Sequence, residues 1–202
     1  MKVRSFLAIE LPESARNALE GFRSQIALPQ FDVRWVLPKN IHLTFRFFGE
    51  VPMETIPGLS EAARIAAYTT RPFMIMLRGV GAFPNARNPR VVWTGVEDPT
   101  PLYQLERCLS TELDGIGWPP PDKPFQPHLT MGRVRSNRGR RELEECLERN
   151  RDQAVGGFLA EHMSLVKSDL HPTGPVYTTL ERFVFPVSPK TQSQNGVTDG
   201  KG

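Results

Sequence analysis

The chain has 202 residues, of which 39% are hydrophobic and 23% charged, a composition typical of a globular protein with a buried core. No apolar stretch approaches the roughly 18 residues of a membrane helix, and the first residues lack the long apolar segment of a signal peptide, so we expect a cytoplasmic protein. The net charge of +3 is too small to establish a nucleic-acid partner, although it agrees with an anionic ligand.

The first half of the chain alternates between strand and helix patterns. Residues 3–11 predict a strand, and Pro12 then opens a helix. The apolar positions of that helix are Ala15, Leu19, Phe22 and Ile26. A strand beginning at Ile41 contains the tripeptide His-Leu-Thr, and it is followed by a helix around 55–69 and a strand from about residue 71.

The second half repeats this order. Its predicted elements are a strand at 90–96, a helix at 101–113, a strand at 128–135, a helix at about 138–150, and strands near 157–168 and 175–186. The strand at 128–135 again begins with His-Leu-Thr. We therefore predict an α+β fold of two pseudo-symmetric lobes, with duplicated sheets, helices outside, and a central cleft that carries one His-x-Thr motif per lobe.

We expect a single two-lobed domain over residues 1–187, with intertwined lobes that correspond approximately to the sequence halves 1–83 and 90–187. The polar segment 188–202 has almost nothing to bury and is predicted to be a disordered tail. Cys108 and Cys146 lack the spacing of a metal site or a disulfide framework, and we predict that both are buried free thiols.

The repeated tripeptide places an imidazole beside a hydroxyl. Side chains alternate between the two faces of a strand, so His42 and Thr44 point the same way, as do His128 and Thr130. The intervening leucines point to the opposite face. If the two strands line one cleft, each lobe presents one imidazole and one hydroxyl to it.

Two imidazoles on opposite sides of a cleft suit phosphodiester cleavage. One takes a proton from the attacking water and the other protonates the leaving oxygen, because an unperturbed histidine titrates near pH 6.5. The threonine hydroxyls can donate hydrogen bonds to the non-bridging oxygens. For one copy alone, a half-buried structural histidine is an alternative, and zinc is another, although no His-x-His or Cys-x-x-Cys supplies a third ligand.

The chain resembles the RNA 2',3'-cyclic phosphodiesterases, or 2'-5' RNA ligase-like proteins, of the two-histidine phosphoesterase superfamily. The resemblance rests on five segments in the family's order: "FLAIELP", "NIHLTFRFFGEV", "PRVVWTGV", "PFQPHLTMGR" and "GPVYTTLERF". It implies opening of a terminal 2',3'-cyclic phosphate on RNA, tRNA fragments among them, to leave a 2'-phosphate, without metal or cofactor. It also implies reversible 2'-5' ligation. We expect a monomer.

The resemblance further implies that His42 is the general acid and His128 the general base, with Thr44 and Thr130 binding the phosphate. An arginine after the second motif is common in the family, and Arg133 matches it. Strict alternation would turn Arg133 away from His128, so its role needs a bend in the strand, which Gly132 could permit.

Several further residues have two interpretations. Arg46 either contacts the phosphate or leans out to solvent, and the five arginines between 133 and 141 either bind an RNA backbone or belong to a solvated surface. Four aromatic residues are candidates either for stacking on a base or for the core: Phe48, Trp93, Phe125 and Tyr177. We interpret His162 and His171 as structural or surface residues.

Two other functions remain open from the residues. The same chemistry could act on a small cyclic nucleotide or sugar phosphate, or the histidines could hold an RNA end without turnover.

Overall fold

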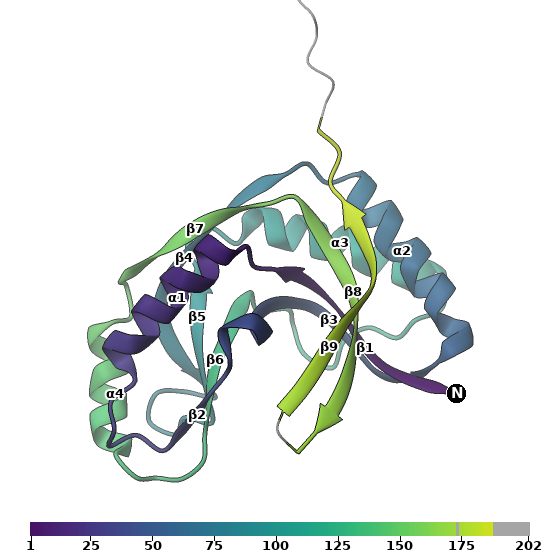
Figure 1. The fold of residues 1–202 in the computed structure, drawn as a ribbon. Helices are drawn as coiled ribbons and strands as arrows, with labels where there is room; N and C mark the ends of the chain where they lie inside the picture. The colour runs from purple at the N-terminus through teal and green to yellow at the C-terminus, as the bar shows by residue number, and fades with distance from the viewer. Residues whose placement is uncertain (173, 188–202) are drawn as a thin grey trace, which may run out of the picture.

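The fold is a curved sheet with helices on its outer side, as seen in a computed structural model that describes residues 1–172 and 174–187 (Figure 1). The predicted tail, residues 188–202, lies outside the described residues. The predicted two-lobed α+β architecture is confirmed. No helix among the described residues has the length and apolar character needed to cross a membrane.

The described residues form one nine-stranded antiparallel sheet in the order β7-β4-β5-β6-β3-β1-β8-β9, with β2 paired to β6. The strands are β1 (Lys2–Glu10), β2 (Val33–Trp35), β3 (His42–Pro52), β4 (Phe73–Phe83), β5 (Val91–Val96), β6 (His128–Val134), β7 (Ala154–Ala160), β8 (His162–His171) and β9 (Gly174–Val184). The two motif strands, β3 and β6, are therefore neighbours at the middle of the sheet.

Four α-helices and two short 3-10 helices connect the strands in the described part of the chain. They are α1 (Glu13–Ile26), α2 (Ile56–Tyr68), α3 (Thr100–Gly115), α4 (Arg140–Arg149), η1 (Pro38–Asn40) and η2 (Met53–Thr55). Helices α2 and α3 cover the half of the sheet that contains β8 and β9, whereas α1 packs on β7 and α4 on β4 (Figure 1). The inner face is left open between the lobes.

The helices form because their apolar residues recur at helical spacing and meet the sheet. The buried residues of α1 are the four predicted ones, Ala15, Leu19, Phe22 and Ile26. Helix α3 buries Leu102, Leu105, Leu109 and Leu113 in the same way. Burial of each leucine stabilises the fold by about 1.5–3 kcal/mol, so these stripes hold the helices on the outer face.

The single strand predicted near 157–168 is wrong, because two strands, β7 and β8, meet there on either side of Glu161. β7 pairs with β4 at one edge of the sheet, and β8 pairs with β1 in the other half. The chain arches between the halves without a Gly or Pro turn (Figure 1). Each half of the sheet therefore contains strands from both halves of the sequence.

The prediction that both cysteines are buried holds for one of them. Cys146 is buried between α4 and the sheet, but Cys108 is exposed, and both are free thiols. Cys108 lies on the solvent side of α3, between the positions that carry the buried leucine stripe.

Candidate active site

The two His-Leu-Thr motifs meet where the halves of the sheet join. β3 and β6 pair through Leu43 and Leu129, the middle residues of the two motifs. In an antiparallel pair this register brings the histidine of each motif toward the threonine of the other, on the face opposite the leucines. Four motif residues line one cavity of about 730 Å³: His42, Thr44, His128 and Thr130.

Both imidazoles are held by the same local hydrogen bond. Nδ1 of His42 lies 2.9 Å from the carbonyl oxygen of Asn40, and Nδ1 of His128 lies 2.7 Å from that of Gln126. A carbonyl oxygen only accepts, so Nδ1 carries the proton in each ring and donates it. Each Nε2 is therefore left to gain or lose a proton in the cleft.

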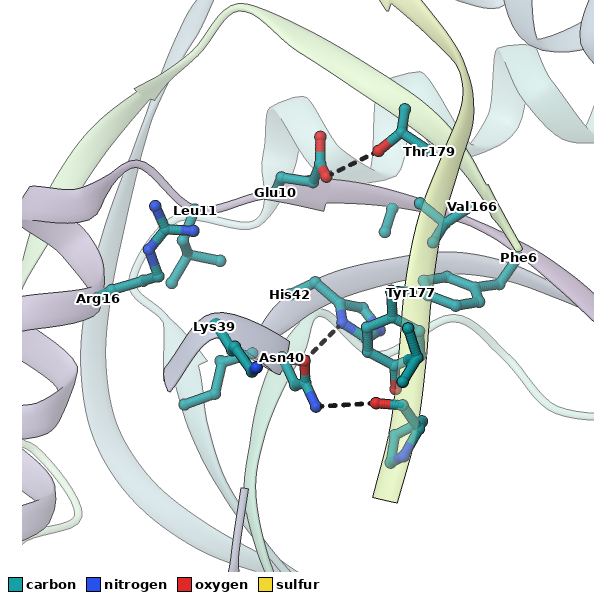
Figure 2. A pocket seen from close by; sticks show the side chains of 14 residues that line it. Phe6, Glu10, Leu11, Arg16, Lys39, Asn40, His42, Val166, Tyr177 and Thr179 are labelled. Carbon is teal, nitrogen blue, oxygen red and sulfur yellow. Dashed lines mark hydrogen bonds between the residues drawn. The ribbon is translucent and has the colours of Figure 1, made fainter. Parts of the chain in front are cut away.

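Aromatic rings enclose His42. Phe6 stacks on the imidazole with a centroid distance of 4.6 Å, and Tyr177 meets it edge-on at 5.2 Å (Figure 2). Burial lowers the pKa of His42 below its usual value of 6.5, while the Asn40 carbonyl and the charge of Glu10 act in the opposite direction. His128 has one such neighbour, Phe83, edge-on at 4.9 Å.

Asn40 also ties η1 to β9. Its side-chain Nδ2 donates to the carbonyl oxygen of Pro175 at 3.2 Å, while its own carbonyl accepts from His42 (Figure 2). Asn40 therefore positions the His42 ring. Asn40 was not among the site residues predicted from the sequence, although its place two residues before the histidine is the available signal.

Glu10 is the second site residue that was not predicted from the sequence. It lies directly opposite His42 across the β1–β3 ladder, so the two side chains share one face. Its carboxylate accepts hydrogen bonds from Ser164 (2.9 Å) and Thr179 (3.2 Å), and Arg182 lies 3.4 Å away. Together with His162, whose nearby imidazole is the largest cause, these partners lower the pKa of Glu10 from 4.5 to about 2. The carboxylate is therefore ionised near neutral pH.

A β-bulge interrupts each motif strand three residues after its histidine. In β3 the pairing with β1 skips Phe45, and in β6 the pairing with β5 skips Met131. The extra residue reverses the alternation that follows. Phe47 and Arg133, each five residues after a histidine, consequently line the cavity. The bend that Arg133 needs is thus present, one residue before Gly132.

Gly132 allows two strands to pack closely, whereas we expected it to permit a bend in β6. A Cβ at this position would lie 2.6 Å from Cγ1 of Val33 and 3.0 Å from the ring of Trp35. Only glycine lets β2 approach β6 this closely. β2 in turn places Trp35 on the cavity wall.

Both interpretations of Arg46 are wrong. The bulge at Phe45 turns Arg46 to the helix side of the sheet, where its side chain is only 5% exposed. Its guanidinium donates to Glu106 Oε1 at 3.1 Å and to Ser110 Oγ at 2.6 Å, both on α3. Arg46 therefore joins sheet to helix and contacts neither solvent nor the cleft.

Of the five clustered arginines, only Arg133 is among the residues that line this cavity. Arg140 donates to the carbonyl oxygen of Arg87, and Arg141 pairs with Glu145 along α4. The others, Arg135 and Arg138, are exposed. This distribution matches the solvated surface that was the alternative to an RNA-binding cluster.

Of the four aromatic candidates for stacking, only Tyr177 is among the cavity-lining residues. Phe48 packs against Trp118, Phe125 against Phe45, and Trp93 against Phe83. The ring partners of Phe48 and Phe125 place these two in or against the core, whereas Trp93 is half-buried opposite Thr130 and its partner Phe83 contacts His128. The bulge and strand pairings, which are not visible in the sequence, supply Phe6, Trp35 and Phe47 to the cavity instead.

The remaining histidines differ in position. His162 contacts Glu10, with Nε2 3.8 Å from the carboxylate, and His171 is an exposed residue at the rim of the cavity. Within residues 1–172 and 174–187, no three histidine, cysteine or acidic side chains gather as a metal site would require.

Known proteins are similar to this chain in sequence and fold. The family model "LigT like Phosphoesterase" matches residues 9–93 and 95–177, so each matched segment contains one His-Leu-Thr motif. An RNA 2',3'-cyclic phosphodiesterase of Methanothermobacter thermautotrophicus is 38% identical over 91% of this chain and 99% of its own length.

Two solved structures are also similar. The protein TT0787 of Thermus thermophilus has a TM-score of 0.75 and 33% identity, over 90% of this chain and 97% of that one. E. coli LigT complexed with 3'-AMP has a TM-score of 0.73 and 26% identity, over 92% and 99% of the two chains. The duplicated motif, the curved sheet and these matches agree, and the chain belongs to the LigT-like phosphoesterase family.

Proposed function

We propose that this chain is an RNA 2',3'-cyclic phosphodiesterase that hydrolyses a terminal cyclic phosphate to a 2'-phosphate. The observation that carries the proposal is the pair of imidazoles in one cavity, each with Nδ1 held by a backbone carbonyl and Nε2 available. The relative at 38% identity is named an RNA 2',3'-cyclic phosphodiesterase, which supports the same reaction. In this proposal residues 1–187 act as one domain, as a cytoplasmic monomer, without a metal or other cofactor.

The reaction requires one proton transfer at each end of an in-line displacement. Nε2 of His128 takes a proton from water as the water oxygen bonds to phosphorus. The bond from phosphorus to O3' breaks on the opposite side, and Nε2 of His42 gives its proton to O3'. The product keeps the phosphate on O2', and exchange with solvent returns both imidazoles to their starting states.

The surroundings of the two histidines support His42 as the acid. Glu10 lies opposite His42 on the neighbouring strand, whereas Gly95 occupies the equivalent place opposite His128. An ionised carboxylate favours an imidazolium, so Glu10 offsets part of the lowering of the His42 pKa by burial, and a glycine opposite His128 supplies no such charge. A bound phosphate anion adds a second negative charge beside the ring and favours the imidazolium further.

Thr44 and Thr130 complete the phosphate site in this proposal. Their hydroxyls lie on the cavity face between the two imidazoles and can donate to the non-bridging oxygens, whose charge increases toward the transition state. The guanidinium of Arg133, brought to the same face by the bulge, supplies a positive charge. No metal is required in this scheme.

An oligoribonucleotide that ends in a 2',3'-cyclic phosphate tests the proposal. With a chelator present, we expect the ring to open and ³¹P NMR to identify a 2'-phosphate. An inactive wild-type protein that binds the RNA and returns it unchanged would make it a binding module instead. A 3'-phosphate product would mean that O2', and not O3', is the leaving oxygen.

The same groups would also support ligation. If a ribose hydroxyl replaces water at His128, the product is a phosphodiester joined through O2', and the reverse reaction regenerates the cyclic phosphate. Adding an RNA with a free 5'-hydroxyl to the same assay measures the ratio of ligation to hydrolysis directly, since a joined strand is longer than either substrate.

A further inference from the structure

A second cavity of about 250 Å³ adjoins the catalytic one, and we call it the side groove. The two cavities share five lining residues: Phe6, Asn40, His42, Pro175 and Tyr177. His128, Thr130 and Arg133 line only the larger cavity. The His42 ring therefore stands between the phosphate site and the side groove, and the groove extends on the side away from His128.

Two cations face the side groove. Arg16 comes from the first turn of α1 and Lys39 from η1, and Figure 2 shows both on one side of the pocket, with His42 and Tyr177 on the other. Within the described residues, neither side chain has an ion pair or a hydrogen bond. Lys39 is exposed and Arg16 half-buried, so both ammonium and guanidinium are available to an anion.

The one carboxylate of the groove does not neutralise these cations. Glu10 turns toward Thr179 and away from Lys39 (Figure 2), and it is already bonded to Ser164 and Thr179 and close to Arg182. The groove thus offers two unpaired positive charges beside a carboxylate that is already engaged by other partners. An anionic ligand fits this distribution better than a cationic or neutral one.

The direction of the proposed displacement indicates which anion would occupy the side groove. Water attacks from the His128 side, and O3' leaves on the His42 side while it stays attached to the ribose. The terminal ribose therefore lies toward His42, and the RNA chain continues from its O5' to the next phosphodiester. The side groove is the cavity that opens beyond His42 in that direction.

We propose that the side groove binds the phosphodiester joining the terminal nucleotide to the one before it, with Arg16 and Lys39 as its cationic partners. This inference rests on the proposed function and narrows its substrate to an RNA chain end rather than a mononucleotide. Arg16 and Lys39 act on binding and leave the proton transfers unchanged.

The test compares adenosine 2',3'-cyclic phosphate with a dinucleotide that ends in the same cyclic phosphate. Wild-type protein is expected to have a higher kcat/KM on the dinucleotide, mainly through a lower KM. A methylphosphonate at the internal linkage, which removes its charge, is expected to abolish the preference. Two exposed ion pairs correspond to a preference of roughly two- to thirtyfold.

The double variant Arg16→Ala/Lys39→Ala is expected to lose the dinucleotide preference and keep the wild-type rate on the mononucleotide. The charge-conserving variant Arg16→Lys/Lys39→Arg is expected to retain most of the preference. A matched control, Arg71→Ala/Arg107→Ala, removes the same charge from exposed positions on other parts of the surface and is expected to keep it.

Four outcomes contradict the inference. Equal wild-type rates on the two substrates overturn it while the proposed function stands. An equal loss of kcat/KM on both substrates in the Arg16/Lys39 double variant also overturns it. So does a loss of the dinucleotide preference in the Arg71/Arg107 control as large as that in the double variant. Inactivity on both substrates overturns the proposed function together with the inference.

Discussion

The strands β3 and β6 carry the same tripeptide, the same backbone hydrogen bond to Nδ1 and a bulge at the same position, yet their neighbours differ. His42 lies beside Phe6, Tyr177 and an ionised Glu10, whereas Gly95 is opposite His128. The duplicated strands place two imidazoles in equivalent backbone positions, and the residues of the neighbouring strands give the two rings different surroundings. In the proposed reaction one imidazole donates a proton and the other accepts one, and this inequality supports that division of roles.

Removing either imidazole tests whether the two lobes share one reaction. His42→Ala and His128→Ala are each expected to lower kcat by about 10²- to 10⁴-fold, because each removes one proton-transfer group. The pH profiles should differ: loss of the acid removes the alkaline limb of kcat/KM, and loss of the base removes the acidic limb. Full activity in either variant, with folding checked by circular dichroism, contradicts a shared site.

Because the bulge in β3 turns Arg46 to the helix side of the sheet, we expect its substitution to lower the stability of the fold. Arg46→Met removes the partner of Glu106 from a largely buried pair, and we expect a loss of about 3 kcal/mol in the free energy of unfolding, measured in urea. The double variant Arg46→Met/Glu106→Leu should recover much of this loss, since no unpaired charge remains. Normal stability with lost activity would place Arg46 at the phosphate after all.

The two threonines test whether the phosphate is held equally from both lobes. Thr44→Val and Thr130→Val each keep the side-chain shape and remove one hydroxyl donor, and kcat should fall on the order of 10²-fold. KM should change little if the hydrogen bond strengthens in the transition state. Thr→Ser at either position restores the donor and serves as the control.

Glu10→Gln removes the main electrostatic difference between the lobes. Without this carboxylate the pKa of His42 falls, so the alkaline limb of kcat/KM should move to lower pH if His42 is the acid. If His42 is instead the base, the acidic limb moves. Glu181→Gln, which removes a carboxylate paired with Arg64 on the helix side, should leave both limbs in place.

The same substitution has a smaller effect on stability. The pKa of Glu10 is about 2 in the folded protein against 4.5 ordinarily, so its contribution is complete above pH 4.5 and is lost as the pH falls through 2. The difference in Tm between wild type and Glu10→Gln should therefore shrink across that interval. A constant difference would mean that packing, rather than the charge, is responsible.

The helices and the motif strands were predictable because local spacing decides them. Ala15, Leu19, Phe22 and Ile26 form a stripe in any α-helix, and they are the residues α1 buries. Arg46 was misplaced because alternation holds only until a bulge, and the bulge depends on pairing with a distant strand. The break between β7 and β8 was missed for a similar reason, since it has no Gly or Pro turn.

The sequence by itself determined that two imidazole–hydroxyl pairs would lie on two equivalent strands, because alternation and repetition are properties of the chain. Tertiary structure alone decided the contact between Leu43 and Leu129, the turn of Arg133 into the cleft, and the place of Glu10 beside His42. These features depend on register between strands far apart in the chain. Burial of the sheet and helix faces against each other selects that register, and no local pattern encodes it.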